Sequence, residues 1–425
     1  MASMRELAER HGGAQLRSNG IVVVSVVALA KADAAAIGIV APALRTALHI
    51  GDARLGLLAS LASGAGAISA LPAGGLVDRR HRPAVVAAAL AAWSVSLGVA
   101  GFAAGFALLA AGRLVSGAVA TIARPVAVSL AGDIFHPSLR GRALAALDAG
   151  QAAGVAVCYL LGALAVRALS WRWLFWWLAA AGLLLALAAR RMDEPVAKRL
   201  PGPPLPAVLR SLLRIRTNVV VLVADSIGNF FYAGVASFAV LYVTSRYGFT
   251  TAFVDALAPA IAAGVIAGIL VGGRVGDRLA RGGTGERRIL VASGSQLAST
   301  ALFGASLLSG SVVTAALLLG LGATVLGAAG PCLDAVRVDI VAPQVRGRAE
   351  AARGLLTLVS SALGPVTFGL VSTAFGGKGH GLALRDAFLV MLFPLAAGAV
   401  TLLAARRSYR ADAAAAGTPT RPPRP

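Results

Sequence analysis

Apolar stretches of about 20 residues follow one another along almost the whole of this 425-residue chain. Each is long enough to cross the roughly 30 Å hydrocarbon layer of a bilayer as a helix. Only 13% of the residues are charged, against about 25% in soluble domains, so the chain could not cover a water-facing surface. The sequence therefore predicts an all-α polytopic membrane protein with spans near residues 19–44, 54–76, 83–104, 107–132, 143–166, 171–189, 217–245, 252–273, 288–308, 311–335, 350–374 and 384–405.

The formal charge of +21 does not indicate a nucleic-acid partner. The 39 Lys and Arg residues lie mainly in short loops between apolar runs and form no single basic face. Cys158 and Cys332 sit inside apolar stretches, where a small buried hydrophobe is a better interpretation than a disulfide or a metal ligand. We expect no metal and no cofactor.

The distribution of basic residues also predicts orientation. If the N-terminus is cytoplasmic, the inner segments hold most of the Lys and Arg residues. The positive-inside rule then places both termini in the cytoplasm, which fits an even number of spans. The first apolar run is too long for the core of a signal peptide, so we expect it to be retained. We expect a multi-pass protein of the inner or plasma membrane.

Two pairs of matching loops reveal an internal repeat. Residues 133–143 read "DIFHPSLRGRA" and residues 339–349 read "DIVAPQVRGRA", while "GGLVDRRHRP" at 74–83 has a counterpart, "GGRVGDRLAR", at 272–281. Matching loops at nearly one period predict two pseudo-symmetric six-helix bundles in parallel. We place the halves at 1–189 and 217–405, with a cytoplasmic linker at 190–216 and a disordered tail at 406–425.

These loops resemble the signature of the major facilitator superfamily. The family pattern Gly-x-Leu-x-Asp-Arg-x-Gly-Arg-basic after the second helix is matched at Gly74, Asp78, Arg79 and Arg82, with His81 and Pro83 as departures. The later copy keeps Gly273, Asp277 and Arg278, and Arg113 with Gly117 in the fourth span looks like the family's Arg-x-x-x-Gly element. The resemblance covers essentially the whole chain and implies a transporter that works by alternating access, not an enzyme.

Within that superfamily the chain looks most like spinster-type proteins and related bacterial exporters. Asp33 precedes Pro42 by nine residues, and "GLLAS", "YLLG" and "WRWLF" agree as well. The chain departs from the spinster pattern at Ala34, where an Arg is usual, and at Ala120, where a glutamate is usual. The Gly-Pro signature of drug/proton antiporters is absent from "GQAAG".

Asp33 and Arg113 are the best candidates for proton coupling. An ionisable group deep in hydrocarbon costs at least about 2.5–3.5 kcal/mol, so it needs a partner or a wet cavity. The resemblance implies that spans one and four both face the central cavity, where Arg113 could control the protonation of Asp33. The alternative is a fixed structural ion pair. Lys31 points to a different side of its helix and either packs between spans or meets an anionic group.

Polar residues in spans five and seven are candidates for the substrate cavity. Asp225, Asn229 and Tyr232 are spaced by four and three residues, which puts them on one helix face. Asp148 and Gln151 form a similar pair in span five. These side chains either contact substrate or protons, or form hydrogen bonds between helices.

The matching loops are interpreted as two gate elements at the cytoplasmic face. Gly74 and Gly273 would permit close helix approach. Asp78 would accept hydrogen bonds at the start of the helix after residues 346–348, and Asp277 at the start of the helix after residues 140–142, where the helix dipole favours an anion. The predicted gate residues are Gly74, Asp78, Arg79, Arg82, Arg142, Gly273, Asp277, Arg278 and Arg348.

The apolar composition also limits the chemical class of substrate that the protein can bind. A sugar carrier would place many amide and aromatic side chains around hydroxyl groups, yet only 6% of the residues are aromatic. We therefore expect a monomeric proton antiporter that exports a hydrophobic or amphipathic small molecule, drug-like or lysolipid-like. The alternatives are an importer of organic anions or nutrients, with Arg113 as an anion anchor, and a non-transporting membrane receptor.

Overall fold

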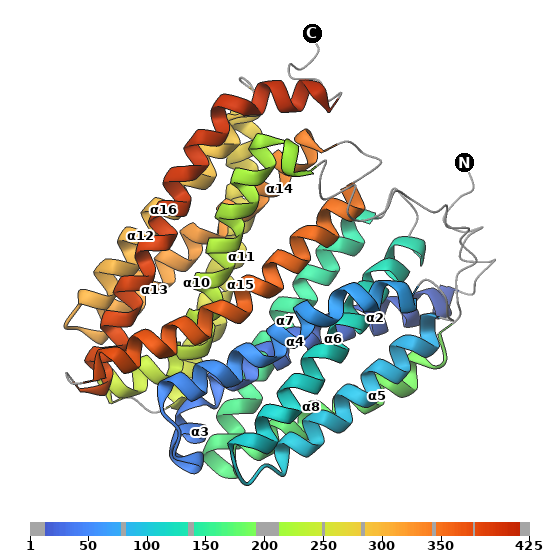
Figure 1. Ribbon diagram of the computed structural model, residues 1–425, viewed down its shortest axis with the longest axis vertical. Helices are drawn as coiled ribbons and strands as arrows, with labels where there is room; N and C mark the ends of the chain where they lie inside the picture. The colour runs from blue at the N-terminus through green and yellow to red at the C-terminus, as the bar shows by residue number, and fades with distance from the viewer. Residues whose placement is uncertain are drawn as a thin grey trace. The chain divides into compact units, whose positions relative to one another are not determined.

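The computed structural model describes residues 13–77, 82–134, 140–192, 212–248, 251–281, 285–341, 346–376 and 379–416. The described residues form helices joined by short turns and include no strand. By compactness, α2 to α8 belong to one unit, whereas α12 to α16 and most of α10 and α11 belong to a second unit. Figure 1 shows these helices along the chain from blue to red.

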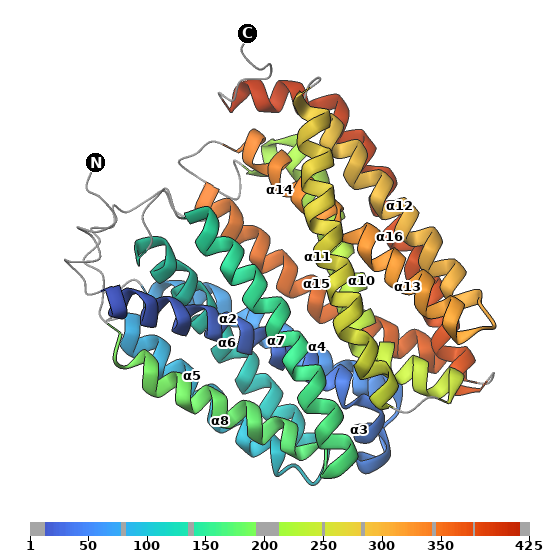
Figure 2. The same cartoon turned by 180° about the vertical axis from the view of Figure 1, so that it is seen from behind.

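The described residues of the first unit include seven helices. They are α2 (Gly13–Ile39), α3 (Ala41–Leu48), α4 (Asp52–Val77), α5 (Arg82–Gly101), α6 (Phe106–Ile134), α7 (Arg140–Ala168) and α8 (Arg172–Ala189). Helix α5 packs against both α6 and α8, while α2 packs against α7, as the reverse view of Figure 2 also shows. Helix α2 also packs against α6 and α8, and it is between α2 and α6 that the first candidate site lies.

The described helices that lie wholly or mostly in the second unit are α10 (Arg216–Tyr247), α11 (Thr251–Arg281), α12 (Arg287–Leu308), α13 (Val312–Gly327), α14 (Ala329–Ile340), α15 (Arg346–Ala374) and α16 (His380–Ala415). Helix α12 packs against α13, α14 and α16. Five buried rings of this unit contact one another in stacked, tilted and edge-on pairs: Phe231, Phe238, Phe303, Phe368 and Phe388.

Eleven helical segments of the described chain are long and apolar enough to cross a membrane, with α13 and α14 counted as one. Helix α6, the fourth predicted span, adds the shorter apolar segment Phe106–Ala120. Together they correspond to the twelve predicted spans. The predicted all-α polytopic fold is therefore confirmed.

Two predicted spans are broken in the structure. The first, expected at 19–44, ends at Ile39 and is followed by the separate helix α3, because Pro42 lies at its start and has no backbone N–H for a continuous helix. The tenth, expected at 311–335, is interrupted at Ala328, whose N–H bonds to the carbonyl of Val325 in a tighter turn. Pro331 then lies in the first turn of α14.

The last predicted span is longer than expected. Helix α16 continues without interruption to Ala415, so residues 406–415, predicted as disordered tail, are helical. Tyr409 and Ala413 are buried in the core of the second unit. The charged residues that suggested a tail alternate with apolar ones at helical spacing, which gives this extension one buried face.

Glycines bring several helix backbones into close contact. A Cβ atom added to Gly154 of α7 would lie 2.1 Å from the carbonyl oxygen of Ala28 in α2, and one added to Gly268 of α11 would lie 1.8 Å from that of Thr324 in α13. No larger residue fits at either crossing without moving a helix. The two crossings therefore fix the distance between the helices of each pair.

Candidate functional site

A buried ion pair lies in the first unit between α2 and α6. The Nη1 atom of Arg113 donates a short hydrogen bond to Oδ1 of Asp33. Both residues are almost fully enclosed, with 4% of Asp33 and 1% of Arg113 exposed. The structure thus brings together the two side chains that the sequence suggested as partners.

Trp93 of α5 completes this site, and the sequence did not predict its role. Its indole Nε1 donates to Oδ2 of Asp33 at 3.2 Å. Trp93 is 60 positions from Asp33 along the chain, so no local spacing connects them. The available signal was chemical, since a tryptophan in an apolar span needs an acceptor for its N–H.

Mutual neutralisation is what makes this burial possible. An unpaired charge in a low-dielectric interior is so costly that removing one member of a buried pair typically destabilises a protein by about 3–5 kcal/mol. The Nε atom of Arg113 is buried without a hydrogen-bond partner in the described part of the chain. The Arg113 guanidinium group therefore depends on Asp33 to compensate its charge. A change in the charge of Asp33 changes the stability of the contact between α2 and α6.

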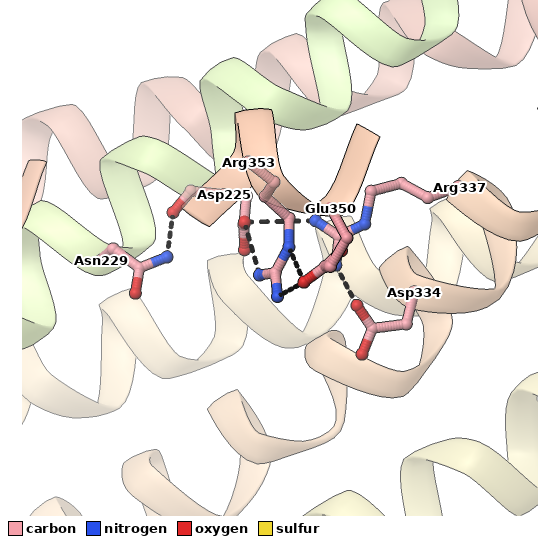
Figure 3. Close-up of polar contacts among 6 residues, drawn as sticks. All are labelled: Asp225, Asn229, Asp334, Arg337, Glu350 and Arg353. Atoms are coloured by element: carbon pink, nitrogen blue, oxygen red, sulfur yellow. Dashed lines mark hydrogen bonds and ion pairs between the residues drawn. The ribbon is translucent and has the colours of Figure 1, made fainter. Parts of the chain in front are cut away.

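A second charged cluster lies in the second unit and contains Asp225 (Figure 3). Oδ2 of Asp225, on α10, accepts hydrogen bonds from Nη1 of Arg337 on α14 and from Nη1 of Arg353 on α15, each at 3.2 Å. One carboxylate thereby joins three helices. The sequence suggested Asp225 as a site residue but neither arginine as its partner.

Each arginine of this cluster has a further acidic partner one turn away on its own helix. Arg337 pairs with Asp334, and Arg353 donates from Nε to Oε1 of Glu350 at 2.8 Å. The side chains of Asp334 and Glu350 are 63% and 59% exposed. Asp225, at 19% exposed, is the most enclosed of the three acids and the one that both arginines share.

The other residues predicted on the face of Asp225 have different surroundings. Asn229 donates from Nδ2 to the backbone carbonyl of Asp225 at 2.9 Å, which is a bond within its own helix. Tyr232 is 57% exposed and is not part of the cluster in Figure 3. In span five, Gln151 is half-buried on α7, whereas the side chain of Asp148 lies outside the described residues.

The later of the two predicted gate loops forms an ion network within the second unit. Arg288 of α12 donates from Nη2 to Oδ1 of Asp277 and from Nη1 to Oδ2 of Asp339, both at 3.0 Å. Tyr409 of α16 donates its hydroxyl to the same Oδ2 of Asp339 at 2.6 Å. Asp277 thus has a partner inside its own unit that the sequence did not predict. Arg278 is exposed.

The role predicted for Gly273 is wrong. A Cβ atom added there would meet Pro331 at an ordinary 3.7 Å, whereas one added to Gly272 would lie 2.4 Å from Cα of Ala328. Gly272 faces the neighbouring helix because its position follows Gly264 and Gly268 at intervals of four residues. Of the other predicted gate residues, Asp78 and Arg79 lie outside the described residues, as do the side chains of Gly74, Arg82, Arg142 and Arg348.

Several solved transporters share this fold. A bacterial homologue of the human lysosomal transporter Spinster, in an inward-facing and unoccupied conformation, is 20% identical with a TM-score of 0.80, over 94% of this chain and 98% of that chain. A D-xylose–proton symporter is 15% identical with a TM-score of 0.69, over 90% and 97%. The nucleoside transporter NupG is 15% identical with a TM-score of 0.72, over 92% and 98%.

Sequence comparison gives the family directly. No curated protein sequence matches the chain, but residues 23–333 match the Major Facilitator Superfamily. The match includes Asp33, Arg113 and Asp225 and the loop pair at 74–83 and 272–281, and it ends before Asp334 and the loop at 339–349. The protein is a multi-pass membrane transporter, not an enzyme, and it belongs to the Major Facilitator Superfamily.

Proposed function

We propose that this protein is a proton-coupled secondary transporter that exports a hydrophobic or amphipathic small molecule, drug-like or lysolipid-like, by alternating access. It acts as a monomer in the cell membrane, with both termini in the cytoplasm, and exchanges protons for substrate. The single observation that carries this proposal is the buried contact of Asp33 with Arg113. A carboxylate in that position is the group best suited to take up and release a proton.

The chemistry of the pair suggests how coupling works. While Asp33 is charged, it holds Arg113 and thereby ties α2 to α6. Protonation removes the charge that stabilises the guanidinium group, so the contact weakens and the two helices are free to separate. Loss of the proton on the other side of the membrane restores the pair. The proton gradient thus drives a change in helix packing.

The surroundings of the pair support an apolar substrate. A cavity of about 10 Å³, too small to hold a substrate, lies beside the pair and is lined by Val26, Leu29, Ala30, Leu90, Trp93 and Ala120. Only the indole N–H of this lining can donate a hydrogen bond, and Asp33 accepts it. A sugar or nucleoside, the substrates named for two of the similar structures, would find few polar partners here. Because Arg113 is engaged by Asp33, a role as anion anchor in an importer is less favoured.

We assign the two networks of the second unit to conformational control. Asp225 holds α10, α14 and α15 together through Arg337 and Arg353, which supports ion pairing between helices over a substrate contact. Arg288 joins α11, α12 and α14 through Asp277 and Asp339. We propose that this second network positions Asp277 for one of two cytoplasmic latches that stabilise the outward-facing state, with the start of the helix after residues 140–142 as the partner of Asp277.

The proposal is tested by replacing Asp33 with asparagine in the purified full-length chain. A thermal-shift screen over drugs and lipids identifies a substrate, whose flux is then followed in proteoliposomes. We expect Asp33→Asn to abolish flux driven by a pH gradient, while exchange of labelled for unlabelled substrate continues without a gradient. Asp52→Asn is the matched control, because Asp52 is another buried aspartate that pairs with an arginine, Arg45, in the same unit.

Two results would contradict the proposal. Undiminished gradient-driven flux in Asp33→Asn would show that Asp33 does not couple proton movement to substrate transport. Uptake of substrate into the compartment that protons enter would show symport, and so favour an importer over an exporter.

A further inference from the structure

Three helix ends are joined at one end of the second unit, where α10 and α12 begin and α16 ends (Figure 1). Thr217, in the first turn of α10, donates its backbone N–H to Oδ2 of Asp412 at 2.9 Å, and its hydroxyl lies 2.7 Å from that of Ser408. Arg410 of α16 donates from Nε and Nη2 to the two carboxylate oxygens of Glu286, which directly precedes α12, at 2.9 and 3.0 Å. These contacts hold the three ends next to one another.

Six exposed arginines lie at or near these ends. They are Arg214, Arg216, Arg287, Arg406, Arg407 and Arg410. Arg410 pairs with Glu286, whereas the other five have no acidic partner in the part of the chain that the structure describes. With Glu286 and Asp412 included, six positive and two negative charges give this group, which we call the basic surface, a net formal charge of +4. Like charges held close together repel one another, so the basic surface favours an anionic partner.

The basic surface lies at the level of lipid headgroups. The apolar segments of α10 and α12 begin with Arg216 and Arg287 themselves. In α16, Arg406 directly follows the predicted span 384–405. That helix has 36 residues, whereas about 20 are enough to cross the hydrocarbon layer, so its last turns lie outside hydrocarbon. Arginines at the ends of spans extend toward the membrane surface. The anions closest to the basic surface are therefore the phosphates of lipids.

Exposed leucines lie one helical turn deeper in the spans than these arginines. Leu290 follows Arg287 by three residues, and Leu403 precedes Arg406 and Arg407 by three and four residues, so each leucine shares a helix face with its arginine or arginines. Both leucines are 39% exposed. In α12 and in α16 alike, the leucine lies toward the middle of the span and the arginine toward its end. A lipid has the same order, with its acyl chains below its phosphate.

We propose that the basic surface binds an anionic phospholipid, whose phosphate is held between the start of α12 and the end of α16. The guanidinium group presents several N–H donors in one plane, a geometry that matches phosphate oxygens. The bound lipid links two helix ends that carry like charges, so it stabilises the second unit by relieving their repulsion. A soluble anion would leave the leucines without a contact. The inference does not depend on the proposed roles of Asp33 or of proton coupling.

The test compares two lipids on the purified full-length protein in a non-ionic detergent. Phosphatidylglycerol and phosphatidylcholine with identical acyl chains are added, and native mass spectrometry gives the apparent Kd of each. We expect tighter binding of phosphatidylglycerol in the wild type, together with a higher melting temperature. An arginine near an anionic lipid surface contributes about fivefold to binding, so Arg406→Gln combined with Arg407→Gln should weaken phosphatidylglycerol binding by about 5–25-fold. Binding of phosphatidylcholine should not change.

A matched control separates this surface from the general attraction between arginines and anionic lipids. Arg190 and Arg191 are likewise adjacent and exposed, and they directly follow α8 in the first unit. Replacing both with glutamine removes the same charge at the end of another span. We expect this control to change phosphatidylglycerol binding by less than about twofold, because the main contribution comes from the joined ends of the second unit. An equal loss in both double variants would overturn the assignment to the basic surface.

Glu286→Gln changes the basic surface in the opposite direction. It removes the carboxylate that holds Arg410, so a sixth arginine becomes available to the lipid. We expect phosphatidylglycerol binding to become tighter by about fivefold. Weaker or unchanged binding in this variant would contradict the proposal. If the double variant of α16 does not fold, Arg287→Gln tests the same surface from α12 and should weaken binding by about fivefold.

Two further results would overturn the proposal. The first is the same phosphatidylglycerol affinity in the wild type and in the double variant of Arg406 and Arg407. The second concerns glycerol 3-phosphate, the soluble headgroup without acyl chains, which should leave the melting temperature of the wild type unchanged. If it raised the melting temperature as much as phosphatidylglycerol at the same concentration, the occupant would be a soluble anion and not a lipid.

Discussion

The crossing of α2 and α7 allows a strong test of how much close helix packing stabilises the first unit. Gly154 lies so close to α2 that a Cβ atom would come within 2.1 Å of the oxygen and 2.6 Å of the carbon of the Ala28 carbonyl. Ordinary contacts between such atoms are about 3.5 Å. Gly154→Ala therefore requires the two helices to separate by about 1 Å.

Overpacking, lost dispersion contacts and a gain in helix propensity together determine how Gly154→Ala changes the free energy of unfolding. Overpacking of a tight contact costs about 1–3 kcal/mol, and a gap of about 0.5–1 Å along the rest of the crossing forfeits a quarter to a half of each dispersion contact. Alanine recovers about 1 kcal/mol through its higher helix propensity. We expect a net loss of about 1–2 kcal/mol, and a melting temperature lower by about 2–8 °C for a unit of this size.

Gly294→Ala is the matched control for this variant. Gly294 lies inside α12, and a Cβ atom added there meets nothing within 4 Å. The same chemical change should therefore raise the melting temperature slightly, because only the gain in helix propensity remains. Thermal unfolding of both variants in one detergent gives the comparison. Equal melting temperatures for Gly154→Ala and Gly294→Ala would refute the reasoning.

The second unit supports two further predictions. Asp225→Asn should destabilise the protein by about 1.5–3 kcal/mol in thermal unfolding, because Arg337 and Arg353 both lose a charged acceptor; Asp334→Asn, at an exposed position, should cost less than about 0.5 kcal/mol. Tyr409→Phe should cost about 1 kcal/mol by removing the hydrogen bond to Asp339, and an unchanged melting temperature would show that this bond contributes nothing to stability.

The sequence predicts the helices well because a bilayer imposes a length and an apolar composition on each span. It predicts the meeting of Asp33 with Arg113 for a related reason, since a charge in hydrocarbon needs a partner and few are present. The break at Ala328 was not predictable from composition, because the run from Val312 to Leu333 carries no charged residue on either side of it. It depends on the proline placed three residues after the break.

The sequence analysis mainly failed to predict ion-pair partners that lie on helices far away along the chain. Asp225 is 112 and 128 positions from Arg337 and Arg353, and both arginines lie close to the ends of predicted spans. A long arginine side chain can extend from a helix end to a carboxylate inside the span, and residue spacing gives no measure of that reach. The prediction for Gly273 was wrong for a different reason, because it followed the position of a family motif. The four-residue spacing of glycines along the helix identifies Gly272 as the residue at the helix contact.

The extended end of α16 has a consequence for how the chain is made. Asp412 accepts a hydrogen bond from the backbone N–H of Thr217, in the first turn of α10 and 195 residues earlier. During synthesis at about 5–20 residues per second, α10 would wait about 10–40 s before its start could be capped. A residue made much later is thus needed by a helix inserted earlier. Assembly of the second unit can finish only after residue 412 has been made and has left the ribosome.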